Sequence, residues 1–136
     1  MFTGGDLIEI TCQHPTIGLI RLAPKGSEDT EIDPGGYMNQ DSDDSVTGDG
    51  QNIVVKNAKR WSVVTPPIGL SESPNNLIQL QQVIDSAEEA VWTFTFIDNS
   101  VYKGTGTIMG DLKGNKNTAM INSIKVGGGG RLEKIA

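Results

Sequence analysis

The sequence predicts a mostly β fold of the α+β class, a sandwich-like barrel of antiparallel strands with one helix beside it. Short runs with the two-residue alternation of β-strands lie on both sides of a single stretch with helical spacing. Residues 90–97 alternate strictly, with aromatic side chains on one face and threonines on the other. The 17 glycines in 136 residues indicate many turns and close approaches between strands.

Length and charge limit the classes of protein to consider. A chain of 136 residues fits one domain, so we expect a single unit over residues 1–136. The net charge of −6 disfavours binding to nucleic-acid phosphates, which needs clustered Lys and Arg. No stretch approaches the roughly 20 apolar residues of a membrane helix, and the first residues lack an export-signal pattern. A single cysteine suits a reducing compartment, so we expect a cytoplasmic protein.

The first elements are expected to be a hairpin followed by a long loop. Strands at residues 7–12 and 17–22 flank a turn that contains Pro15. Beyond a short strand near residues 30–32, the chain is rich in Gly and Asp, and such a long connection is usually functional or disordered. We therefore expect an interaction loop at residues 33–50. Its candidate contact residues are Tyr37, Met38, Asp41, Asp43, Asp44, Val46 and Asp49.

Strand patterns resume after this loop. Residues 53–56 and 60–64 read as strands, and Pro66 ends the second because proline cannot donate to a ladder. Three later strands are expected to form a meander, at residues 90–97, 101–108 and 118–126. Alternation is lost near Asn122, so a bulge or kink is expected there. The aromatic residues expected in the sheet core are Trp61, Trp92, Phe94 and Phe96.

A single helix is expected from Leu77 to about Ala87. Ser73 or Asn75 can cap it, because these side chains accept hydrogen bonds from the free N–H groups of a first turn. Its apolar side chains recur at helical spacing and are expected to pack on the sheet. These side chains are Leu77, Leu80, Ile84 and Ala87.

A catalytic or metal site finds little support. Cys12 and His14 would share one face of a strand, as a Cys–His nucleophile pair or half a zinc site would require. The chain has one cysteine and one histidine, so a buried cysteine and a turn histidine are favoured. The aspartates at residues 41–44 lack the glycine and glutamate positions of a calcium loop. We expect no enzyme activity, no cofactor and no metal.

The glycines and the tryptophans each allow a structural and a functional interpretation. Gly104, Gly106 and Gly110 favour bulges or tight turns, with close approach of another chain's backbone as the alternative. The four glycines at residues 127–130 favour a tight bend, since they lack the spacing of a nucleotide-binding loop. The tryptophans favour core positions, with stacking platforms of a ligand- or carbohydrate-binding β-sandwich module as the alternative.

A series of segments runs from Gly35 to the end of the chain. It comprises Gly-Gly at residues 35–36 before the acidic loop, Lys-Arg-Trp-Ser at 59–62, a leucine-rich helix, Ala-Val-Trp-Thr at 90–93, Val-Tyr-Lys-Gly-Thr-Gly at 101–106, Gly-Asp-Leu-Lys-Gly-Asn at 110–115, and Gly-Gly-Gly at 127–129 before Leu-Glu-Lys-Ile at 132–135. In this series the chain resembles the tail tube proteins of contractile-tailed bacteriophages. The series includes no catalytic motif.

The resemblance implies a fold of two packed antiparallel sheets with one flanking helix. Such subunits form hexameric rings whose inner sheets join into a β-barrel, and the stacked rings form a conduit for DNA ejection. The implied partners are copies of itself and the tail sheath, tape-measure, baseplate and terminator proteins. DNA would pass through without specific binding, in a virion tail assembled in the host cytoplasm. The loop residues named above would contact neighbouring subunits or rings. A related tail-completion or baseplate protein is the alternative.

Overall fold

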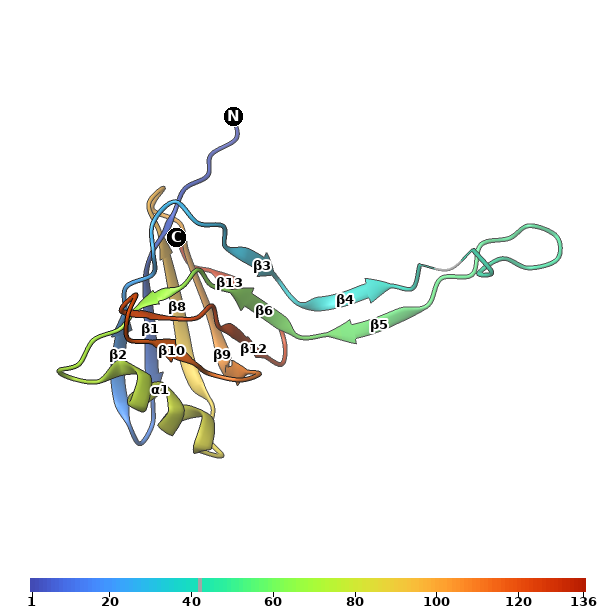
Figure 1. The fold of residues 1–136 in the computed structure, drawn as a ribbon. Helices are drawn as coiled ribbons and strands as arrows, with labels where there is room; N and C mark the ends of the chain where they lie inside the picture. The colour runs from blue at the N-terminus through green and yellow to red at the C-terminus, as the bar shows by residue number, and fades with distance from the viewer. Residues whose placement is uncertain (42) are drawn as a thin grey trace.

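A computed structural model describes residues 1–41 and 43–136. Figure 1 shows a body of antiparallel sheets and one helix, from which a long hairpin projects to one side. The fold is mostly β, as the sequence predicts. Over the described ranges, no helix has the length and apolar composition needed to cross a membrane.

The larger sheet holds eight antiparallel strands with the meander at its centre. Its order is β2-β1-β8-β9-β12-β6-β3, and β13 also pairs with β9. The N-terminal hairpin and the short strand near residues 30–32 are confirmed. The strands are β1 (Leu7–His14), β2 (Gly18–Leu22), β3 (Glu31–Asp33), β6 (Trp61–Val64), β8 (Ala90–Phe96), β9 (Val101–Met109), β12 (Lys125–Gly128) and β13 (Glu133–Lys134).

Two smaller sheets complete the fold. One has the order β10-β11-β7 and lies with the helix α1 on the body in Figure 1. The other pairs β4 with β5 in the projecting hairpin. The remaining elements are β4 (Gly36–Asn39), β5 (Lys56–Lys59), β7 (Ile68–Gly69), α1 (Asn76–Asp85), β10 (Gly114–Asn115) and β11 (Met120–Ile121).

The core lies between the larger sheet and the layer formed by α1 and the three-stranded sheet. Leu80 of α1 and Ile121 of β11 belong to the same buried cluster as Trp92 of β8. The opposite face of β8 stays partly open at Thr93 and Thr95. The predicted core aromatics are confirmed as buried, namely Trp61, Trp92, Phe94 and Phe96.

A hydrogen bond from the indole N–H group fixes each tryptophan in the core. Trp61 Nε1 donates to the Thr105 carbonyl at 3.1 Å, and Trp92 Nε1 donates to the Gly106 carbonyl at 3.0 Å. A buried indole needs such a partner for its N–H group. Trp61 also meets Phe94 edge-on, with ring centroids 6.4 Å apart. Neither ring is exposed, so neither tryptophan can serve as a stacking platform for a ligand or carbohydrate.

Glycines of β9 allow close packing inside the chain. A Cβ atom at Gly104 would lie 2.7 Å from the Trp61 ring, and one at Gly106 would lie 2.2 Å from the Gly127 carbonyl oxygen. The predicted bulge or turn is therefore wrong at these two positions, because both lie in a regular strand. It is confirmed at Gly110, which has a φ of +81° just after the strand ends.

Helix α1 begins and ends slightly earlier than predicted. Of the two candidate caps, Asn75 is confirmed, since its Oδ1 accepts from the Ile78 N–H group at 3.0 Å. The helix ends at Asp85, so Ala87 lies outside it and is exposed. The side chains on the core are Leu80 and Val83, which are fully buried, with Leu77 and Ile84 partly buried beside them.

The third meander strand is two strands in different sheets. β11 belongs to the three-stranded sheet and β12 to the larger one, so the predicted single strand over residues 118–126 is wrong. The chain changes sheets near Asn122, where the alternation is lost. The glycine run also differs from the predicted bend, because Gly127 and Gly128 continue β12 and only the last two glycines turn the chain.

Candidate assembly surface

The arm, residues 34–41 and 43–60, is a hairpin that extends away from the body (Figure 1). At its base, Gly36 lies opposite Lys59 in the β4–β5 pair. Pairing continues towards the tip, where the Ile53 N–H group donates to the Ser45 carbonyl at 2.7 Å. Of the described residues in the segment predicted as a loop, Asp33 ends β3 and the others form one side and the tip of this hairpin.

The other side of the arm corrects the strand predicted at residues 53–56. β5 includes only Lys56 of that run. Ile53, Val54 and Val55 lie outside the sheets of the body, with exposed fractions of 44%, 57% and 39%. A short apolar run indicates extended backbone, but it does not specify which strand pairs with it or whether other parts of the protein bury its side chains. These three residues and the acidic run lie at similar distances on either side of the Gly-rich turn near Gly48 and Gly50. That spacing is the signal that would have predicted a hairpin with the two runs opposite each other.

The tip of the arm presents an oriented carboxylate. Asp49 accepts hydrogen bonds from the Thr47 hydroxyl and from Gln51 Nε2, the second at 3.2 Å. The Gln51 N–H group in turn donates to Thr47 Oγ1 at 3.0 Å. The hydrogen bond from Thr47, above all, lowers the pKa of Asp49. The tip therefore carries a negative charge at neutral pH.

The base of the arm is tied to the body. The Asp33 carboxylate accepts from the Gly35 N–H group at 3.0 Å and pairs with the Lys59 ammonium at 3.0 Å. These contacts, with Gly35 first, lower the pKa of Asp33. The Arg131 guanidinium lies 5.9 Å from the Tyr37 ring centroid, in the range of a cation–π contact. The body thus directs where the arm points.

The predicted contact residues all lie on the arm and are exposed. Tyr37 and Met38 are 65% and 49% exposed, and Val46 near the tip is 52% exposed. The sequence prediction missed the apolar residues on the opposite side of the hairpin. Apolar side chains gathered on a projecting element are typical of a surface for contact with another molecule. The exposed acidic members are Asp41, Asp43, Asp44 and Asp49.

The larger sheet offers two further surfaces at its edges. Among the described residues, its strand order ends at β2 on one side and at β3 on the other. An edge strand presents backbone N–H and C=O groups that can pair with a strand of another chain. The edges at β2 and β3 are therefore surfaces where a strand of another chain could pair.

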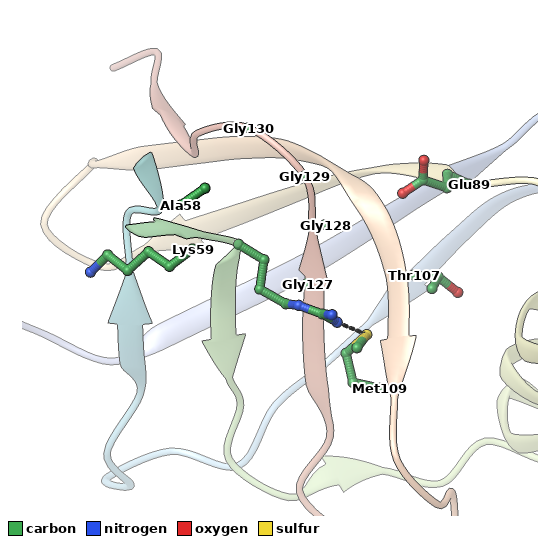
Figure 2. Close-up of a pocket in the computed structure, with 10 residues that line it drawn as sticks. Ala58, Lys59, Glu89, Thr107, Met109, Gly127, Gly128, Gly129 and Gly130 are labelled. Atoms are coloured by element: carbon green, nitrogen blue, oxygen red, sulfur yellow. Dashed lines mark hydrogen bonds between the residues drawn. The ribbon is translucent and has the colours of Figure 1, made fainter. Parts of the chain in front are cut away.

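A groove of about 620 Å³ lies beside the arm base. Figure 2 shows the glycine run passing between the arm residues Ala58 and Lys59 and the β9 residues Thr107 and Met109. Sequence analysis missed this groove, because its members come from four separate segments. The lining residues are Ala58, Lys59, Arg60, Glu89, Thr107, Met109, Gly127, Gly128, Gly129 and Gly130.

Cys12 and His14 share one face of β1, as predicted, and both are buried. Burial raises the pKa of the Cys12 thiol to about 12, which suppresses the nucleophilic thiolate. His14 Nδ1 accepts the N–H groups of Thr16 and Ile17 at 3.1 and 3.2 Å, so the ring holds the β1–β2 turn. Over residues 1–41 and 43–136, no group of three His, Cys, Asp or Glu side chains is placed to hold a metal ion.

No protein-family model matches this chain, and no curated protein matches it. The arm, the two sheet edges and the groove are features of the described residues that the packing of the body does not account for.

Proposed function

We propose that this protein is the structural subunit of a bacteriophage tail tube and assembles with copies of itself into stacked hexameric rings. The observation that carries the proposal is the arm, a directed hairpin whose apolar side chains the body does not cover. The hexameric ring and the stacked tube in this proposal rest on the resemblance of the sequence to tail tube proteins.

The exposed apolar side chains of the arm supply the free energy of the proposed contact. Tyr37, Met38 and Val54 are each about half exposed or more. Complete burial of a side chain of this size contributes about 1.5–3 kcal/mol, so covering the exposed half contributes roughly half of that before the costs of association. In a ring, each subunit repeats the same contact, so modest contacts add up to a strong joint between rings.

The sheet edges suit closure within a ring. Pairing β2 of one copy with β3 of the next would remove both edges, and closure around a ring would end lateral growth. Contact of an arm with the next ring is head-to-tail and does not close, so it produces a filament. Tape-measure and terminator proteins are then needed to set the length, and tail sheath and baseplate proteins are further proposed partners.

The charge of the chain agrees with a passive role towards DNA. At −6 per subunit, a tube repels phosphates and disfavours contacts that release counterions. We propose that DNA passes through without specific binding, and that the protein is structural rather than enzymatic. Its proposed location is the virion tail, after assembly in the host cytoplasm.

Negative-stain imaging and sedimentation of the purified protein at high concentration test the proposal. We expect rings or tubes, nucleated by tail sheath or baseplate extract where spontaneous assembly is slow. Sedimentation as a monomer at every concentration, with and without the extract, would contradict it.

An arm deletion separates assembly from folding. Gly36 and Lys59 are opposite each other, so residues 37–58 can be replaced by Asn-Gly, which closes a two-residue hairpin. We expect an unchanged melting temperature for the body and no tubes. Normal tubes from this variant would show that the arm is not the joint.

A further inference from the structure

We infer that the groove beside the arm base receives the acidic arm tip of a second copy of this chain. The inference rests on the proposed function, which supplies the second copy, and it identifies the surface that the arm meets. The groove and the tip lie at opposite ends of the same arm, so each copy would give one contact and receive one.

Arg60 supplies the charge in the groove. Its Nη1 donates to the Met109 sulfur at 3.2 Å, the dashed contact in Figure 2. A thioether is a weak acceptor, and a guanidinium has five N–H donors. Lys59 is already paired with Asp33, whereas no carboxylate in the described part of the chain forms an ion pair with Arg60. The groove therefore holds a cation without a matched anion.

The glycine run leaves room for an incoming chain. A Cβ atom at Gly127 would lie 2.9 Å from the Trp61 carbonyl oxygen, and one at Gly128 would lie 2.1 Å from that of Thr105. Packing of the body accounts for these two glycines. A Cβ atom at Gly129 would meet nothing within 4 Å, so the body does not need a glycine there. The open space at this position is available to a second chain.

The arm tip has the complementary shape and charge. Gly48 and Gly50, on either side of Asp49, have open space around them and make the tip narrow. The Asp49 carboxylate is already oriented by Thr47 and Gln51, so little side-chain entropy is lost when it meets a partner. A carboxylate on a guanidinium forms the strong, two-bond type of ion pair. Glu89, on the far side of the groove, disfavours an approach from that side.

The reach of the arm fits a contact between neighbouring copies. From Gln51 to Lys59 the chain extends by about 25 Å at the rise of a β-strand. A domain of about 100 residues has a radius of gyration of about 13 Å, so the body is roughly 30 Å across. The arm is thus nearly as long as the body is wide, which is the scale of the spacing between adjacent copies. Because the contact is head-to-tail, it repeats from copy to copy.

Charge reversal tests the pairing. We expect Arg60→Glu to raise the concentration needed for assembly at least about tenfold, because it places like charges together. Asp49→Arg is expected to do the same, and the combination of both to restore assembly in part. Lys113→Glu makes the same charge change at an exposed position outside the groove, and it is expected to assemble normally. Assembly of Arg60→Glu at the wild-type concentration would overturn the inference.

Disulfide trapping tests the contact directly. Gly129→Cys and Gly48→Cys place thiols in the groove and at the tip, where a Cβ atom meets no neighbour. Oxidation of their mixture is expected to give a covalent dimer. Gly48→Cys mixed with Gln81→Cys, on the exposed face of α1, is the control and is expected to stay uncoupled. Tubes that form without the groove–tip disulfide would overturn this inference alone. Absence of both tubes and disulfide would overturn the proposed function with it.

Discussion

The body and the arm use the same strand pattern and differ in what covers it. Val63 of β6 is fully buried between the layers of the body, whereas Val54 on the arm is 57% exposed. Both lie in short runs rich in valine. The apolar side chains of the body stabilise one subunit, and the exposed part of those on the arm would contribute if a second molecule covered it.

Glycines show the same contrast. Gly106 in the body is required because a Cβ atom would collide with the backbone of β12. A Cβ atom at Gly48, on the arm tip, would meet nothing within 4 Å. Substitutions in the body are therefore expected to change folding, and those on the arm to change assembly.

Leu80→Asp is expected to have the largest effect. It buries an unpaired charge in the core and is expected to lower the free energy of unfolding by roughly 4 kcal/mol or more. Ile78→Asp, on the exposed side of the same helix, is the control and is expected to be nearly neutral. Thermal denaturation followed by circular dichroism measures both. Equal melting temperatures for the two variants would show that the helix does not pack as described.

Gly106→Ala is expected to come next, because the added methyl group meets backbone that cannot move aside. We expect a loss of about 3 kcal/mol in unfolding free energy, measured by urea denaturation. Gly129→Ala adds the same group in open space and is expected to stay within about 0.5 kcal/mol of the wild type. A neutral Gly106→Ala would contradict the close approach of β9 and β12.

Alanine substitutions at Val63 in the body and Val54 on the arm compare the two regions directly. Val63→Ala leaves a cavity and is expected to cost about 2 kcal/mol of stability. Val54→Ala is expected to leave stability unchanged and to weaken assembly, as seen by sedimentation. A destabilised Val54→Ala monomer would mean that the arm packs on its own body.

The smallest expected effect concerns the junction of body and arm at low pH. The folded-state pKa of Asp33 is lowered, so its stabilising contribution is present above the ordinary value of about 3.9 and is lost as pH falls through the lowered value. The protection factor of the Gly35 amide, which is its hydrogen-exchange rate by NMR corrected for the intrinsic pH dependence of exchange, is expected to fall in that range relative to pH 6. In Asp33→Asn this pH-dependent change is expected to disappear. Its persistence would assign the effect to another group.

The candidate site was predictable only in part, for reasons that particular residues show. A change in composition was enough to identify the acidic side of the arm, from Tyr37 to Asp49. The prediction of a sheet strand at residues 53–56 is wrong for residues 53–55, because a short apolar run has the same sequence pattern on a projecting hairpin and in a core. The groove was missed, since the contact between Arg60 and Met109 joins segments 49 residues apart.

Local rules determined what the sequence alone could predict. The alternation of β8 identified the buried face with Trp92 and Phe94, and Asn75 was a correct candidate for the helix cap, because both signals depend only on nearby residues. Only the tertiary structure decided that residues 118–126 divide between two sheets and that the apolar arm stands away from the body. Strand partners and burial depend on contacts between distant segments, such as Gly106 against Gly127, and no local pattern contains them.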